Sequence, residues 1–218
     1  MRPYDGRRKF DVIDPVIEPL WSGTRVLAHL VSTPDAEQAV DLALIEELGA
    51  DLVEELPTLA QALGRSVMAI DAIIDGVISR QVSLDGIGVA PISEVRASTT
   101  GLLMRNNAHL DVVPRGAVED VEVRTEPVDG FIAVDLLRVD GTSLLDVPLL
   151  ERKRLLESII DQGDLVRVSA HVRPPIDTWV GTWKAMGLRG GMLKAANSRY
   201  HPSDDTIEWR IVERLGGR

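Results

Sequence analysis

Side chains that could act as nucleophiles or bind metals are scarce in this sequence. Lysine occurs at four positions, Lys9, Lys153, Lys184 and Lys194. Histidine also occurs at four positions, each isolated in sequence, His29, His109, His171 and His201. No serine or carboxylate constellation accompanies any histidine at a recognisable spacing, which favours core or surface roles for them. Cysteine is absent, which excludes disulfides and thiolate metal sites. A mechanism based on an amine nucleophile therefore has four candidate residues.

Composition excludes several further classes. The 218 residues are 44% hydrophobic, enough to bury a core as one domain or one domain with an appendage. The sequence contains no long uncharged apolar run and no apolar stretch near Met1, so we expect a cytoplasmic protein without membrane contact. A formal charge of −10 opposes the phosphate neutralisation on which nucleic-acid affinity depends. We therefore expect direct DNA binding to be weak.

The first half of the chain mixes strand and helix patterns. Residues 25–31 are rich in branched apolar side chains and predict a strand. Thr33-Pro34-Asp35 resembles a helix start, with Gly49 as its end, although residues 40–45 would also suit a strand.

Two further elements are expected before residue 81. Residues 57–63 predict a short helix that stops near Gly64. The apolar run 67–74 leads into Asp75-Gly76, a dipeptide typical of turns, and then Val77-Ile78, so a hairpin is expected there.

The second half has a clearer pattern. Residues 81–129 form short alternating pieces broken by glycine and proline, which indicates extra strands or an ordered insertion. Residues 131–139 then predict a strand, Asp140-Gly141 a turn, and Asp146-Val147-Pro148 the cap of a helix. The apolar face of that helix comprises Leu149, Leu155, Leu156, Ile159 and Ile160. The remaining predicted elements are strands at 165–170, 191–195 and 207–212 and a helix at 177–186. Without a βαβ rhythm, this order predicts an α+β fold with antiparallel sheets flanked by helices.

Three stretches together resemble the nucleotidyltransferase (adenylation) domain of ATP-dependent DNA ligases. Residues 18–25 follow the family pattern Glu-Pro-Lys-x-Asp-Gly-x-Arg, and residues 74–77 match its Asp-Gly-Glu hairpin. The longest stretch runs from Val134 to Glu213, nearly without gaps from Met186 onward. The resemblance implies one ligase-like domain over residues 1–218, divergent at about 81–129. It ends where a ligase would begin its OB-fold domain, so we expect none here.

Departures from the family pattern affect the chemistry that the resemblance implies. Adenylyl transfer uses a lysine amine as the nucleophile, and Leu20 occupies that position. The family aspartate two residues later is Ser22, and Val77 replaces the glutamate that contacts ribose. The sequence therefore predicts no catalytic residue.

Further departures concern the metal, the base and the phosphates. Arg189 replaces the acid that helps to hold the metal, and Val134 replaces the aromatic residue that stacks on adenine. The phosphate-binding Lys-x-Lys pair becomes Ile211 and Glu213. The Ser-Arg-Asn-Gly loop that touches nucleic acid becomes residues 46–49, Glu-Glu-Leu-Gly. We therefore expect no metal site and no useful binding of ATP as a cofactor.

Six positions keep the residue that the family has, Glu18, Gly23, Arg25, Asp75, Gly76 and Lys194. The resemblance makes them a candidate residual nucleotide pocket, in which the glutamate would read the adenine amino group. Structural retention is the alternative explanation, because Gly23, Asp75 and Gly76 suit tight turns whether or not a ligand binds. Glu18 and Arg25 could also pair with each other or with surface partners. We favour structural retention, since function must be argued from sites and not from folds.

Three functions remain open at this point. The first is a non-catalytic ligase-like domain that binds a protein partner or self-associates, linked to DNA repair through its family. The second is a sensor that binds an adenine nucleotide non-covalently through Glu18. The third is an enzyme of different chemistry in the same cleft, with Asp75, Asp135 and Glu208 collecting a metal ion.

Overall fold

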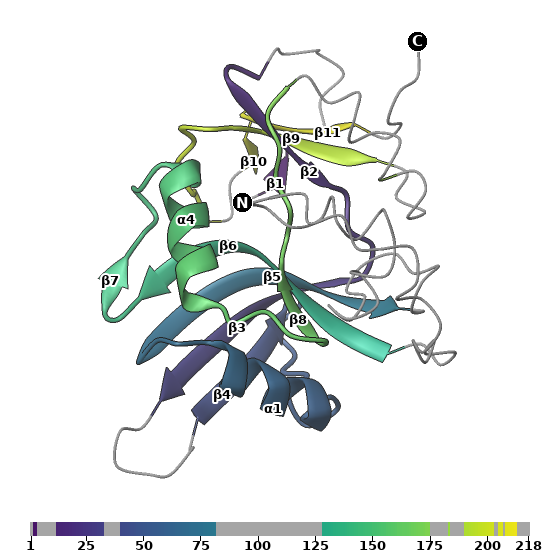
Figure 1. Cartoon of the computed structure of the whole chain (residues 1–218). Helices are drawn as coiled ribbons and strands as arrows, with labels where there is room; N and C mark the ends of the chain where they lie inside the picture. The colour runs from purple at the N-terminus through teal and green to yellow at the C-terminus, as the bar shows by residue number, and fades with distance from the viewer. Residues whose placement is uncertain are drawn as a thin grey trace, which may run out of the picture.

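The computed structural model describes residues 2–3, 12–32, 40–81, 128–174, 183, 190–202, 205–206 and 208–212. Within these residues, a larger and a smaller sheet are packed together with two helices (Figure 1). The larger sheet has the order β4-β3-β5-β6-β7, with β8 beside β6. Its strands are β3 (Thr24–Ser32), β4 (Val40–Glu46), β5 (Asp71–Gln81), β6 (Val128–Val139), β7 (Thr142–Ser143) and β8 (Val166–Val168).

The smaller sheet lies above the larger one in Figure 1 and has the order β11-β9-β2. Its strands are β2 (Pro15–Pro19), β9 (Gly191–Ala195) and β11 (Trp209–Val212). A short parallel pair joins β1 (Arg2–Pro3) to β10 (Asp205–Thr206). Both larger assemblies are antiparallel apart from the β6–β8 pair, so the α+β prediction is confirmed.

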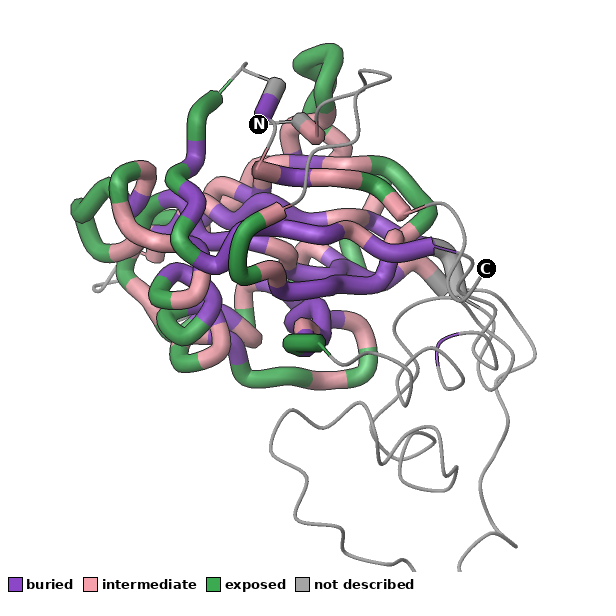
Figure 2. The backbone as a smooth tube through the Cα atoms, turned by 90° about the horizontal axis from the view of Figure 1, so that it is seen from above, coloured by how far each residue is buried: buried purple, intermediate pink, exposed green. Residues whose placement is uncertain are grey.

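The main hydrophobic core lies between the larger sheet and helix α1 (Pro57–Ser66). Strand β3 alternates as predicted and buries Val26, Ala28 and Leu30. The helix contributes its apolar stripe, Leu59 and Leu63, to the same core. The central strands accordingly form the most buried part of the chain, with exposed loops around them (Figure 2).

Residues 40–46 decide between the two alternatives for this segment, because they form strand β4 and not part of a helix. The strand pairs antiparallel with β3 along its full length, and Leu44 is fully buried. Pairing with β3 therefore outweighs the local helix signals, as tertiary context often does. Gly49 lies after the strand with a φ of 92° and does not end a helix. Residues 33–39, where that helix would have begun, lie outside the described residues.

The predicted hairpin at Asp75-Gly76 is wrong, because β5 runs through both residues. Asp75 pairs with Leu27 of β3 and with Asp135 of β6, and register shifts in the β5–β6 pairing flank it. Gly76 is required there by packing and not by a turn. A Cβ atom added to Gly76 would lie 2.3 Å from Cζ of Phe131.

The turn and helix expected after β6 are present. Asp140 and Gly141 have φ values of 45° and 78°, as a two-residue hairpin turn requires. Helix α4 (Leu149–Ile159) follows, but its N-cap is Pro148 without a side-chain capping bond. Helix α1, which was expected to stop near Gly64, continues through this residue to Ser66.

Of the remaining predictions, three correspond to strands of the structure and two fall mostly outside the described residues. The strands expected at 165–170 and 191–195 correspond to β8 and β9, and that expected at 207–212 corresponds to β11. Most of 81–129 lies outside the described residues, as does the helix expected at 177–186 apart from the buried Trp183.

We predict that Gly76→Ala destabilises the fold by about 1–3 kcal/mol, because the new methyl group overpacks against Phe131. The backbone oxygen of Ile132, 2.8 Å from the added Cβ, prevents easy relaxation. Urea unfolding measures the loss. Gly163→Ala is the matched control, because a Cβ atom there meets nothing within 4 Å. Equal midpoints for the two variants would contradict this reading of the glycine.

Candidate functional site

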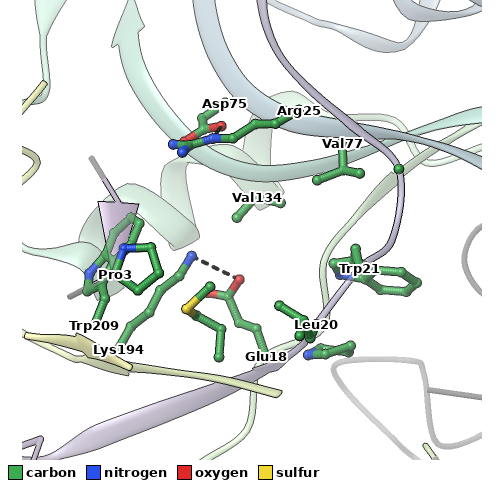
Figure 3. Close-up of a pocket in the computed structure, with 13 residues that line it drawn as sticks. Pro3, Glu18, Leu20, Trp21, Arg25, Asp75, Val77, Val134, Lys194 and Trp209 are labelled. Carbon is green, nitrogen blue, oxygen red and sulfur yellow. Dashed lines mark hydrogen bonds and ion pairs between the residues drawn. The ribbon is translucent and has the colours of Figure 1, made fainter. Parts of the chain in front are cut away.

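A pocket of about 190 Å³ lies between the two sheets. Five of the six retained positions line it, although they come from distant parts of the sequence; Gly76 packs beneath Phe131 instead. In Figure 3, Val134 lies between the Arg25–Asp75 pair and the Glu18–Lys194 pair. The lining residues are Pro3, Glu18, Pro19, Leu20, Trp21, Gly23, Arg25, Asp75, Val77, Val134, Met192, Lys194 and Trp209.

Glu18 forms the centre of a buried charge cluster. Its Oε2 accepts a hydrogen bond of 3.1 Å from Lys194, and Lys153 Nζ lies 2.7 Å from its Oε1. All three side chains are at most 2% exposed. Burial works to raise the pKa of Glu18, but the charges of both lysines outweigh it and hold that pKa below its usual value. Burial lowers the pKa of Lys153, against the opposing attraction of the carboxylate.

Strand pairing explains how two of these residues meet. Glu18 lies on β2 and Lys194 on β9, where they are diagonal neighbours because Val16 is directly opposite the lysine. Lys153 comes from α4, which sequence reasoning had assigned by its apolar face alone. The apolar pattern of that helix contains no signal that Arg152 and Lys153 are buried.

Arg25 pairs with Asp75 and not with Glu18, which corrects a second expectation. Its Nε and Nη2 donate hydrogen bonds of 2.9 and 2.5 Å to the two carboxylate oxygens. Tyr200 accepts from Arg25 and donates to Asp75, both at 3.1 Å. The hydrogen bond to Asp75 is the main reason why the pKa of Arg25 is raised. Burial, followed by the Asp75 charge, raises the pKa of Tyr200.

A second carboxylate–guanidinium pair lies beneath the pocket. Arg152 on α4 donates two hydrogen bonds of 2.8 Å to Asp135 on β6, and both side chains are fully buried. Arg152 also donates to the backbone oxygen of Ser198. These contacts satisfy the charges that the α4–β6 packing removes from water.

The proposed metal-binding carboxylates do not come together as a site. Asp75 and Asp135 are opposite one another on β5 and β6, but each is held by its own arginine. In the described ranges, no group of three or more histidine, aspartate or glutamate residues is arranged to hold a metal ion. The structure therefore gives no support to the metal hypothesis that included Glu208.

Leu20 lies in the pocket wall, two residues after Glu18. Its backbone N–H donates to Gly190 O at 3.0 Å, which fixes this loop against the start of β9. Gly23 follows with a φ of 148°, and a Cβ atom there would lie 2.1 Å from the backbone oxygen of Ile78. The chain therefore enters β3 too close to β5 for any side chain at residue 23.

The comparisons with known proteins identify the family. Residues 95–210, more than half of the chain, match the profile described as the ATP dependent DNA ligase domain. The chain belongs to the ATP-dependent DNA ligase domain family. The match begins beyond Leu20, so the equation of Leu20 with the family lysine rests on the pattern in residues 18–25.

Individual relatives of this ligase-family chain are longer than it is. A DNA ligase from Natronomonas pharaonis is 29% identical over 194 residues, which are 88% of this chain and 31% of that protein. The ligase domain from M. tuberculosis LigD has 21% identity and a TM-score of 0.57, covering 90% of this chain and 53% of that one. A mycobacterial DNA ligase D complexed with ATP and MES also has 21% identity and a TM-score of 0.57, and 54% of it is covered. These structures show that the ligase-family chain has the ligase nucleotidyltransferase fold.

None of the described helices in this ligase-family chain is long and apolar enough to span a membrane.

His171 lies at the edge of the charge cluster and is predicted to make folding sensitive to acid. Burial, with a smaller contribution from Lys153, lowers its pKa from 6.5 to about 4. Below pH 6.5, His171 binds a proton in the unfolded chain but not in the folded chain. The free energy of unfolding therefore falls as pH drops towards 4. We expect this histidine to account for up to about 3 kcal/mol of that loss.

Chemical denaturation at a series of pH values checks this prediction. His171→Gln should flatten the stability curve between pH 6.5 and 4, leaving the loss due to carboxylates such as Glu18 at lower pH. His29→Gln on β3 is the control for the loss of an imidazole elsewhere in the chain. An unchanged slope in the His171 variant would show that another group causes the acid sensitivity.

Proposed function

We propose that this chain is a catalytically inactive member of the ATP-dependent DNA ligase family that acts as a binding or scaffold module. The observation that carries the proposal is the pocket wall around Leu20. A leucine has no lone pair with which to attack phosphorus, and the adjoining walls are formed by Val77 and Val134. Aliphatic side chains thus occupy the positions that the family resemblance assigns to the nucleophile, the ribose contact and the adenine stack.

The two lysines near the pocket are poor substitutes for the missing nucleophile. Lys194 donates to Glu18 and lies 4.3 Å from the centre of the Trp209 ring. Lys153 is fully buried against the same carboxylate and does not line the pocket. An attacking amine must be free to reach phosphorus, whereas both ammonium groups are held against the buried Glu18 carboxylate.

The partner is proposed to be a protein or a second copy of this chain. The formal charge of −10 opposes tight DNA contact, because phosphate neutralisation provides most of the affinity of DNA-binding domains. A role in DNA repair would then come from attachment to a repair complex and not from gripping the nucleic acid. Family membership is the support for that link.

Self-adenylylation is the direct test. The purified chain is incubated with α-labelled ATP and Mg²⁺ or Mn²⁺, beside an active ATP-dependent DNA ligase, and covalent label is measured after denaturation. We expect no label on this chain, because residue 20 lacks an amine. Stoichiometric label would overturn the proposal, and loss of that label in Lys194→Ala would identify a relocated nucleophile.

Restoring variants make the same test sharper. Leu20→Lys alone should remain unlabelled, since Val77, Val134 and Ile211 still provide no contacts for ribose, base or phosphates. The combination of Leu20→Lys with Val77→Glu, Val134→Phe and Ile211→Lys should bring measurable label. Label on the single variant at the level of the active ligase would mean that the pocket binds ATP well already.

A non-covalent adenine nucleotide sensor is the second candidate, because Glu18 and Lys194 both line the pocket. Against it, the Glu18 carboxylate is already engaged by two lysines. We expect no rise in melting temperature with ATP, AMP or NAD, with or without magnesium, because a ligand stabilises only the state that it binds. A rise of several degrees that Glu18→Gln abolishes would favour the sensor instead.

A further inference from the structure

The buried charges around the pocket balance one another. Among the described residues, the buried charged side chains are three carboxylates and three cations, namely Glu18, Asp75 and Asp135 against Arg152, Lys153 and Lys194. Arg25, which bonds to Asp75, is 38% exposed, so water solvates its charge. A charged ligand would lose its own hydration without meeting an unmatched buried charge, which is unfavourable. The balance therefore favours a neutral occupant.

The walls of the pocket are largely apolar, and the space that they enclose is small. Leu20, Val77 and Val134 contribute aliphatic surface, and Trp21 directs its only polar hydrogen to Ser169, 2.8 Å away. The volume of about 190 Å³ lies below the ~300–1,000 Å³ of sites for drug-sized ligands. An apolar cavity of about 150 Å³ accepts benzene. The occupant should therefore be about one ring in size.

Lys194 provides one directed polar contact in this apolar space. It lines the pocket, and among the described residues its one hydrogen-bond acceptor is Oε2 of Glu18 (Figure 3). An ammonium group has three donors. The Trp209 ring lies on one side of the ammonium group, with 4.3 Å from Nζ to the ring centre. A donor is left for an occupant, although the charge of Lys194 is already matched by Glu18.

We propose that this pocket binds a small neutral molecule, one aromatic ring that carries a hydrogen-bond acceptor such as a carbonyl group. Lys194 donates to the acceptor, and the ring packs against Leu20, Val77 and Val134. A nucleobase fits less well, because the carboxylate that would bind its amino group, Glu18, is held by two lysines. The inference goes beyond the proposed function and does not depend on it, since it rests on charge balance and volume.

Calorimetric titration of the full chain tests the charge of the ligand with three probes of nearly the same shape. Acetophenone is neutral, whereas benzoate is an anion and benzamidinium a cation. We expect acetophenone to bind and each charged probe to bind about tenfold more weakly, because the pocket matches neither charge. No acetophenone binding, or equal or tighter binding of either charged probe, would overturn the proposal. Tighter binding of adenine would overturn it too, in favour of a residual base site.

Infrared spectroscopy tests the directed contact. The carbonyl stretching band of bound acetophenone should lie at a lower wavenumber than in an apolar solvent, because a bond from an ammonium group weakens the carbonyl bond. Lys194→Met should remove this shift and lower the affinity about tenfold, while Lys153 still neutralises Glu18. An unshifted band in the parent chain would contradict the role of Lys194, and this measurement decides the matter if the variant fails to fold.

A filling variant locates the site. Val77→Phe should block acetophenone binding, because the added ring occupies the cavity without changing its charge. Ile70→Phe, at an exposed position, is the matched control for the added ring and should bind acetophenone like the parent chain. Unchanged binding in Val77→Phe would place the ligand elsewhere and overturn the assignment to this pocket.

Discussion

The buried carboxylate of Glu18 joins two neighbouring strands of the smaller sheet to helix α4. It belongs to β2, and the lysines that neutralise it come from α4 and β9. Because a buried carboxylate without partners is very unfavourable, this contact requires the helix and the small sheet to come together. Neighbouring Arg152 on α4 pairs with Asp135 in the larger sheet. Two successive helix residues thus link the two sheets, and the pocket lies where they meet.

The same arrangement limits what the pocket can do. Arg25, Arg152 and Lys153 each have a carboxylate partner, and Lys194 shares one of these. Cations that are committed to internal pairs contribute little to holding a polyphosphate, because a new contact must compete with an existing one. The remaining walls are aliphatic and aromatic. The described pocket lining therefore combines internally paired charges with aliphatic and aromatic side chains.

Packing explains several residues that the family resemblance had presented as remains of a nucleotide site. Gly76 accommodates the ring of Phe131, and Gly23 allows the chain to pass the Ile78 backbone. Asp75 on β5 bonds both to Arg25 on the neighbouring strand β3 and to Tyr200, which follows β9 of the smaller sheet. None of these contacts requires a ligand. They support structural retention for these three positions, while Glu18 and Lys194 remain in the pocket itself.

The sequence by itself determined the fold class, the strands 25–31, 131–139 and 191–195, and the family, because hydrophobic periodicity and ordered motifs are local signals. The sequence also shows Leu20 at the position that the family resemblance assigns to the lysine nucleophile. Local signals left residues 40–46 open between helix and strand, and pairing with β3 decided for the strand. The turn signal at Asp75-Gly76 failed, because both residues pair with β3 and with β6 and so continue β5. The burial of Lys153 and the choice of Asp75 as the partner of Arg25 depend on contacts across two sheets and a helix. Charge pairing over such separations has no sequence period, so only the tertiary structure could decide it.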